Sequence, residues 1–437
     1  MTSGVTIRGA TGNRDDVILD GGGMLTWSST HVIAIDADDV TVADLTIRNG
    51  DEHGISVQGR DRPVLYNLHI LDTGYQLVKV NPVGDGSEDG LLACSRLEYT
   101  TTSLEDYTNG ISAHNAHRWT VRDNGWYRIR TPGNAPVPTI LFWSGSSDTV
   151  VERNLLVDCY QGISFGNASH GEGDHSGGIV RNNIIYASMP HDVVIEMVHA
   201  TDWLVAHNTA LLLDPEGVTW GMEARFSDTE GIFVNNLTNL NIWTDRDGAA
   251  ATATGNVTAV TSDWFVDASG ADLHLAAGAT GAIDQAAPLP AGVTDDFDGD
   301  PRPIGSAADV GADEVTQATP AAVTDLRVRR AVTHATTLTA TLAWTPPAGA
   351  ITATLRCSAT RITAGNWAGA TFLTGTLTGG SGVFTAVVPY QRGDRAYFVH
   401  RWQNAAGEWS ALSNNAFWPA ELAFLPLVAR PSGFLLQ

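Results

Sequence analysis

Two groups of polar residues on short alternating segments carry the types needed for acid–base chemistry. The first group consists of Gln58, Lys79, Asn81 and His114, followed one segment later by Arg128 and Arg130. An amine or an imidazole can remove a proton from a carbon atom beside a carboxylate, provided that a cation neutralises that carboxylate. Lys79 or His114 would be the base, and the two arginines would be the neutralising cations.

The second group consists of Glu196, Glu223 and Arg225. If the two glutamates lie on stacked strands, their carboxyl groups can stand about 5 Å apart, which is the separation found in retaining glycosidases. Two other interpretations remain open. The glutamates can form a surface ladder neutralised by Arg225, or they can form a cation site.

Two further runs have the residue types of metal ligands. Asp296, Asp298 and Asp300 form an Asp-x-Asp-Gly-Asp pattern that could bind calcium through hard oxygen ligands, and an acidic surface turn is the alternative. The run from His170 to His175 also contains metal-ligand types, but it lies in a glycine-rich loop without rigid supporting residues.

The strands that carry the two polar groups align in one register. With a period of two, the first and third residues of each strand point inward and the second and fourth point outward. The first outward column is Ser56, Lys79, Ser112, Phe142, Ser164, Glu196 and Glu223. The second is Gln58, Asn81, His114, Ser144, Gly166, Val198 and Arg225. A shift of one residue in the fourth strand would instead place Trp143 outside and Phe142 inside. Lys79 and Glu196 are four coils apart, or about 19 Å at the strand spacing.

These strands belong to a repeat whose anchors are separated by 23 to 30 residues. The anchors are Asp44, Asn67, Ser95, Asn124, Asn154, Asn183, Asn208 and Asn236. A period of this length predicts a solenoid, because each unit is too thin to bury its own apolar face. Asn tolerates left-handed backbone dihedrals, so we expect it at the turn between two strands. Inward asparagines on stacked coils are also expected to bond one another in a ladder.

The repeat resembles the right-handed parallel β-helix of the pectate-lyase-like superfamily over about residues 1–315. The resemblance implies a polysaccharide or cell-surface glycan as the partner and, first among activities, β-elimination by an acidic-polysaccharide lyase using the Lys79 group. It departs from the known families, because neither an arginine-centred lyase signature nor a crowd of calcium-binding aspartates is present. A glycoside hydrolase using Glu196 and Glu223 and a non-catalytic carbohydrate-binding or adhesin-like protein are the alternatives.

A second domain is expected after a short linker at 316–322. Residues 323–419 contain alternating segments at the spacing of a β-sandwich. They resemble a fibronectin type III domain, with Trp344 and Tyr397 at core positions. Residues 420–437 form a tail. The predicted fold class is therefore all-β, a parallel β-helix followed by a small sandwich.

Composition limits the partners and the location. The net charge of −23 argues against nucleic acid and against an anionic membrane. Cys94, Cys159 and Cys357 form no disulfide framework, and no apolar run reaches the ~18 residues of a membrane span. We expect an extracellular or surface protein and a monomer. The chain opens inside a coil without a cap, which favours an incomplete N-terminus.

Overall fold

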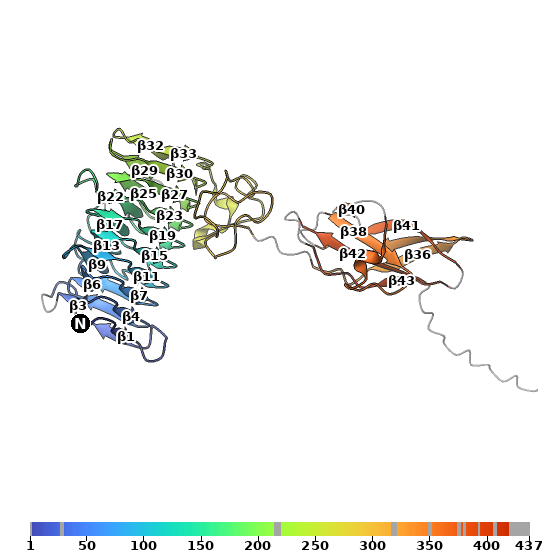
Figure 1. Ribbon diagram of the computed structural model, residues 1–437, viewed down its shortest axis with the longest axis horizontal. Coiled ribbons are helices and arrows are strands. Elements are labelled where there is room, and N and C mark those ends of the chain that lie inside the picture. The colour runs from blue at the N-terminus through green and yellow to red at the C-terminus, as the bar shows by residue number, and fades with distance from the viewer. Residues whose placement is uncertain are drawn as a thin grey trace, which may run out of the picture. The chain divides into compact units, whose positions relative to one another are not determined.

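The computed structural model describes residues 2–26, 30–135, 137–213, 220–315, 321–347, 352–373, 377–378, 382–391, 394–404 and 409–418. The chain forms two compact units, Met1–Thr316 and Gln317–Gln437 (Figure 1). Most of the expected linker and the whole expected tail lie outside the described residues. No helix in the described part of the chain is long and apolar enough to cross a membrane.

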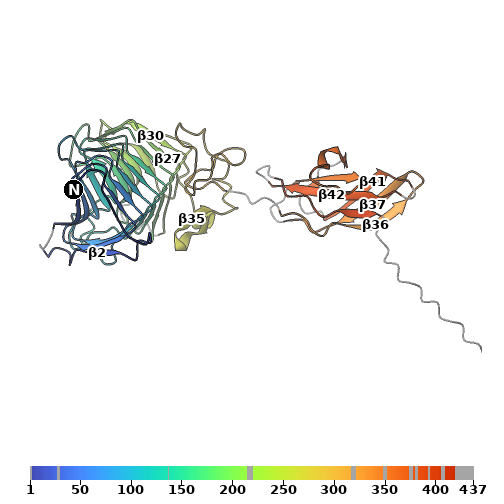
Figure 2. The same cartoon turned by 60° about the horizontal axis from the view of Figure 1, so that its bottom comes forward.

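The first unit is a right-handed parallel β-helix built from four parallel sheets (Figure 1, Figure 2). The site sheet, named for the residues discussed below, contains β3 (His31–Ile35), β6 (His53–Gln58), β9 (Val78–Asn81), β13 (Ile111–His114), β17 (Ile140–Trp143), β21 (Ile163–Phe165), β25 (Val193–Val198), β29 (Trp220–Arg225) and β32 (Ile242–Arg246).

The other three sheets complete each coil. The ten-stranded sheet contains β1 (Thr6–Arg8), β4 (Thr41–Ala43), β7 (Val64–Tyr66), β11 (Leu91–Ala93), β15 (Thr120–Arg122), β19 (Val150–Glu152), β23 (Ile179–Arg181), β27 (Trp203–Ala206), β30 (Gly231–Val234) and β33 (Thr252–Thr254). A nine-stranded sheet contains β2 (Ile18–Asp20), β5 (Thr46–Gly50), β8 (His69–Thr73), β12 (Arg96–Glu98), β16 (Gly125–Tyr127), β20 (Leu155–Val157), β24 (Ile184–Ala187), β28 (Thr209–Leu212) and β31 (Leu237–Thr238). A five-stranded sheet contains β10 (Ser87–Glu88), β14 (Ala116–His117), β18 (Ser146–Ser147), β22 (His175–Ser176) and β26 (Ala200–Thr201).

Apolar residues at equal positions of successive coils form the core. In the ten-stranded sheet the central residue of each strand points inward, and the stack comprises Leu65, Leu92, Val121, Val151, Val180, Val205 and Phe233. Each of these side chains is fully buried. Burial of one such side chain stabilises the fold by about 1.5–3 kcal/mol, so the lengthwise stack supplies the core that a single coil lacks.

The asparagine ladder is confirmed. Each side-chain amide donates to the next carbonyl oxygen at 2.9–3.0 Å, and the ladder runs through Asn124, Asn154, Asn183, Asn208, Asn236 and Asn256. The prediction that the ladder residue itself takes the left-handed turn is wrong. The positive φ falls one residue earlier, for example 51° at Arg153 and 54° at Asn182. The ladder asparagine is therefore free to point inward, and the upstream anchors Asp44 and Asn67 are corner residues instead.

The fourth of the strands aligned from the sequence, β17, takes the shifted register. In β17, Leu141 pairs with Ser112 and Trp143 pairs with His114, so the prediction that Phe142 and Ser144 lie in the outward columns is wrong. Phe142 is fully buried and pairs with Phe165 in the core. Both candidate registers place apolar residues inside, and packing between coils decides between them.

A less regular segment ends this unit. It contains the short helices η1 (Ser262–Trp264) and η2 (Ala268–Gly270) and the antiparallel pair β34 (Phe265–Asp267) and β35 (Asp272–Leu275). Arg302 and Glu314 form a fully buried ion pair at 2.8 Å within it. The Arg302 guanidinium also donates to the carbonyl oxygens of Asp309 and Gly311, so its buried charge is hydrogen-bonded as burial requires.

The second unit is a small antiparallel β-sandwich. One sheet contains β36 (Arg327–Thr333), β37 (Thr337–Ala343) and β41 (Val383–Pro389). The other contains β38 (Thr352–Ser358), β39 (Thr371–Phe372), β40 (Leu377–Thr378), β42 (Ala396–Gln403) and β43 (Ala416–Trp418), and a short helix η3 covers Trp367–Gly369. Trp344, Phe398 and Trp402 lie in its core, whereas Tyr397 is only half-buried and packs beside Phe417.

Candidate functional site

The outer face of the site sheet brings the predicted basic residues together. Lys79 in β9 lies between Ser56 in β6 and Ser112 in β13, all at the same register position. Its Nζ is 2.7 Å from Nε2 of His114, the residue two positions further along β13. The same Nζ donates to the hydroxyl of Tyr107 at 3.3 Å and lies 3.4 Å from Oγ of Ser112.

Burial sets the protonation of this group. Lys79 is only 5 % exposed, and burial lowers the pKa of its amine to about 8. Burial, followed by the charge of Lys79, lowers the pKa of His114 to about 4. Burial raises the pKa of Tyr107. At neutral to mildly alkaline pH, therefore, His114 is neutral and Tyr107 keeps its proton, while Lys79 changes its charge.

The Lys79 group is the centre of a longer row of ring contacts along this face. On one side Tyr107 packs edge-on against Tyr75 at 5.6 Å between centroids, Tyr75 contacts His53 at 6.0 Å, and His53 stacks on His31 at 5.1 Å. On the other side Trp143 lies 4.4 Å from His114 and 4.3 Å from His170. We call this row the aromatic track; it comprises His31, His53, Tyr75, Tyr107, Lys79, His114, Trp143 and His170.

The predicted substrate-binding amides lie beside the track. Asn81 donates to Oγ of Ser56 at 3.1 Å and to the side-chain oxygen of Gln58 at 3.4 Å. Gln58 donates to the same Ser56 hydroxyl at 2.8 Å. Asn81 lies two residues after Lys79 on one strand, so both side chains belong to the same face of the sheet.

Neither predicted arginine joins this group. Arg128 follows β16 at a corner where the backbone has φ 54°, and its guanidinium donates to Glu98 at 2.8 Å. Arg130 is buried and donates to the carbonyl oxygens of Pro190 and Asp158 at 2.8 Å and 3.3 Å. Groups on other coils therefore engage both side chains.

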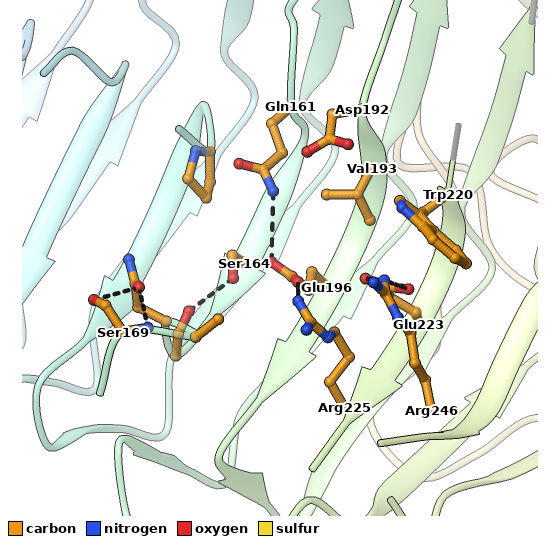
Figure 3. A pocket seen from close by; sticks show the side chains of 14 residues that line it. Gln161, Ser164, Ser169, Asp192, Val193, Glu196, Trp220, Glu223, Arg225 and Arg246 are labelled. Atoms are coloured by element: carbon orange, nitrogen blue, oxygen red, sulfur yellow. Dashed lines mark hydrogen bonds and ion pairs between the residues drawn. The ribbon is translucent and has the colours of Figure 1, made fainter. Parts of the chain in front are cut away.

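The second predicted group lines a cavity of about 500 Å³ on the same sheet (Figure 3). Glu196 in β25 and Glu223 in β29 are register neighbours, as predicted. Arg225 donates to Glu196 at 3.2 Å and to Asp247 at 2.9 Å. Glu223 is bound by both of its oxygens to Arg246, a residue that we did not predict from the sequence.

The two glutamates lie at paired positions of neighbouring strands, and each affects the pKa of the other. Burial, then the charge of Glu223, raises the pKa of Glu196 to about 7. Burial also raises the pKa of Glu223, against the lowering effect of Arg246. Repulsion between two neighbouring carboxylates disfavours the state in which both are charged, so Glu196 is readily protonated near neutral pH.

The cavity also contains an aromatic surface. Trp220 lies at the start of β29, and the guanidinium of Arg246 stacks over its ring at 3.7 Å from the centroid. Gln161 approaches Glu196 from the opposite side at 3.5 Å, and both residues point into the cavity (Figure 3). An indole ring beside carboxyl and guanidinium groups suits the apolar face and the hydroxyl groups of a sugar.

The predicted calcium ligands do not converge. Asp296 is buried, and its carboxylate accepts backbone N–H groups of Asp298, Asp300 and Glu314 at 2.8–2.9 Å. Asp298 pairs instead with Nε2 of His274 at 3.0 Å. In the described chain, the Asp-rich run is thus a turn held by Asp296, as in the alternative interpretation.

Tyr107 and Arg246 are among the site residues that the sequence did not predict. Tyr107 lies in the irregular stretch 100–109, where no strand register applies, and that interruption of the repeat was the only signal. Arg246 lies one coil beyond the aligned strands, and a register shift between β29 and β32 brings it opposite Arg225. Extending the alignment by one coil would have found it only if that shift had been known.

Comparisons with known proteins concern the fold. Residues 30–210 match the family model described as a right handed beta helix region. Comparison with curated protein sequences finds no match. A solved structure of pectate lyase Pel9A is similar with a TM-score of 0.40 and 13 % identity, covering 72 % of this chain and 87 % of that one.

Two further solved structures show a weaker likeness. An alginate lyase from Paenibacillus sp. str. FPU-7 has a TM-score of 0.36 and 15 % identity, covering 58 % of this chain and 90 % of that one. The tailspike protein gp49 from Pseudomonas phage LKA1 has a TM-score of 0.25 and 12 % identity, covering 88 % and 62 %. At these values the similarity extends to the fold alone.

Proposed function

We propose that the protein cleaves an acidic polysaccharide by β-elimination, with the glycan bound along the aromatic track. The observation that carries the proposal is the position of Lys79. Its amine has a pKa lowered to about 8, and it contacts both His114 and a tyrosine hydroxyl on the outer face of the β-helix. A lysine tuned to this range is suited to act as a general base near neutral pH.

In this mechanism the neutral amine of Lys79 removes the proton from the carbon beside the uronate carboxylate. The electron pair left behind forms a carbon–carbon double bond, and the bond to the glycosidic oxygen breaks. The departing oxygen takes the phenolic proton of Tyr107, whose raised pKa keeps it protonated until then. His114 holds the amine in place through its Nε2 atom.

The carboxylate of the substrate must also be stabilised as charge develops. Arg128 and Arg130 do not supply a cation here, because other groups engage them. The amide of Gln58 donates one hydrogen bond, to Ser56, and its second N–H takes this role in the proposal, with Asn81 holding the Gln58 oxygen. Amide groups are established donors to developing oxyanions. The open face of stacked coils would accommodate several sugar units in a row.

The direct test is to incubate the full-length protein with a panel of uronate-containing polysaccharides and to follow ultraviolet absorbance of the unsaturated product. Absorbance that rises with at least one glycan supports the proposal. Reducing ends that appear without this absorbance would show hydrolysis instead. Retention of a glycan on an affinity column without any cleavage would show a binding protein.

Hydrolysis of a glycosidic bond in the cavity lined by Glu196 and Glu223 is the second candidate function. The observation that favours it is the pKa of Glu196, which burial raises to about 7 and which therefore suits a general acid. The ion pairs of Glu196 with Arg225 and of Glu223 with Arg246 count against it, because a retaining glycosidase needs one carboxyl group as proton donor and the other as a free nucleophile.

A further inference from the structure

The end of the aromatic track nearest the first coils contains a cluster of metal-ligand types. His31 begins β3, His53 begins β6, and these two residues are register partners. Glu52 directly precedes His53. One possible ligand atom from each of His31, Glu52 and His53 lies within 4.8 Å of those of the other two.

The two imidazoles carry nitrogen atoms with no hydrogen-bond partner. The Nδ1 atoms of His31 and His53 are both buried and unpaired among the described residues. His53 is only 7 % exposed, so the missing partner is not replaced by bulk water. A buried polar atom without a partner destabilises the fold, and a metal ion that accepts its lone pair would remove that cost.

Glu52 supplies a carboxylate that the rest of the described chain does not use for an ion pair. Its own backbone is fixed, since its N–H donates to the carbonyl of Thr30 at 3.2 Å and its carbonyl accepts from Tyr75 at 2.7 Å. The side chain is half-buried beside the two rings. Two imidazoles and a carboxylate on neighbouring strands form a donor set with a net negative charge.

We propose that His31, Glu52 and His53 bind a divalent transition-metal ion such as Zn²⁺ or Co²⁺. Imidazole nitrogens favour these ions, whereas calcium prefers a shell made of oxygen atoms. Metal–ligand bonds of about 2.0–2.1 Å put tetrahedral donors roughly 3.4 Å apart, so the side chains must close by small rotations. No hydrogen bond of the Nδ1 atoms has to break for this. The proposal of a metal site does not rest on the proposed cleavage reaction.

The experiment uses the full-length, tag-free protein after removal of metals with a chelator. Co²⁺ is titrated while visible absorption is recorded, and Zn²⁺ and Ca²⁺ are then tested as competitors. We expect saturable Co²⁺ binding that Zn²⁺ displaces and Ca²⁺ does not. H31F and H53F keep a ring in the stack but remove the ligand nitrogens. Each should weaken binding by more than about 100-fold, because loss of an outer partner alone costs 10–100-fold.

The matched control is H334F, which changes an exposed histidine of the second unit. It should bind Co²⁺ like the unaltered protein. Circular dichroism checks the fold of each variant, and H31F decides the question if H53F does not fold, because His31 is only half-buried. The proposal is overturned if the unaltered protein shows no saturable Co²⁺ binding, or if binding persists unchanged in H31F.

Discussion

Lys79 and His114 lie on adjacent coils with Nζ 2.7 Å from Nε2, and this contact joins the two halves of the aromatic track. The pairing of β9 with β13 fixes this distance, because it places Val78 opposite Ile111. Lys79 follows Val78 by one residue and His114 follows Ile111 by three, so both side chains lie on the outer face of the sheet. Lys79 is also the sole lysine among the 437 residues. A measurement that is selective for lysine therefore reports on Lys79 alone.

Replacement of Lys79 should separate a base from a simple cation. K79A removes the amine, and we expect turnover to fall about 10²–10⁴-fold, the usual contribution of a general base. K79R keeps a positive charge but has no accessible neutral form, so it should be as inactive as K79A. E196Q is the control and should retain most activity, because Glu196 lies about 19 Å from Lys79. Activity retained by K79R would reduce Lys79 to a binding residue.

The titration of Lys79 can be observed directly. Lysine-selective isotope labelling gives one side-chain signal, and we expect its midpoint near pH 8 instead of the ordinary 10.5. The folded protein then binds fewer protons than the unfolded chain between these values, so stability rises with pH across that window. K79M should remove this rise. A midpoint near 10.5 would contradict the buried environment and remove Lys79 as a base.

The pair Glu196 and Glu223 should give stability the opposite pH dependence, in a lower pH range than Lys79. Burial raises the pKa of Glu196 from 4.5 to about 7, so the folded state binds more protons in this interval. Stability should decline as pH rises from 4.5 to 7, and E196Q should remove that part of the decline.

Glu98 serves as a comparison for Glu196, because its pKa is lowered instead of raised. Burial opposes it, but hydrogen bonds from Arg96 and His69 lower the pKa of Glu98 to about 2. The stability that this carboxylate contributes is present above pH 4.5 and is lost as pH falls toward 2. E98Q should remove only the loss of stability that occurs as pH falls from 4.5 toward 2. Urea unfolding of E196Q and E98Q from pH 2 to 8 measures how each substitution changes the pH dependence of stability. If both changed it in the same direction, the two opposite pKa shifts would be refuted.

The asparagine ladder should contribute measurably to stability. N154L removes the side-chain hydrogen bonds that join Asn154 to Asn124 and to Asn183, and we expect a loss of about 1–3 kcal/mol in the free energy of unfolding. N256L is the control, because Asn256 ends the ladder and is half-buried. Its replacement should cost less. Equal urea midpoints for the two variants would show that the ladder hydrogen bonds contribute little beyond packing.

The second unit should fold by itself. Its core cluster around Trp344, Phe398 and Trp402 is formed by residues of this unit alone. We therefore expect an isolated segment of residues 323–419 to give the circular dichroism of a β-sheet protein and a cooperative thermal transition. A segment without such a transition would show that the boundary at residue 323 is wrong. The control is a segment with Trp402→Ala, which should lose about 3–5 kcal/mol.

The sequence alone determined the features that repeat. Alternation with a period of two identifies the inward stack, and the recurrence of asparagine identifies the ladder, because parallel coils place equal positions above one another. The same reasoning brings Lys79 beside His114 and Glu196 beside Glu223. Each of these neighbours follows from register, which depends on residue spacing within a coil.

Only the tertiary structure decided the features that leave the repeat. Arg128 follows Tyr127 at a corner with positive φ, so its side chain turns to Glu98 instead of the site sheet. Phe142 and Trp143 are equally apolar choices for the core, and contact with neighbouring coils selects Phe142. Tyr107 reaches Lys79 from an irregular loop, whose course depends on long-range contacts that no local pattern records.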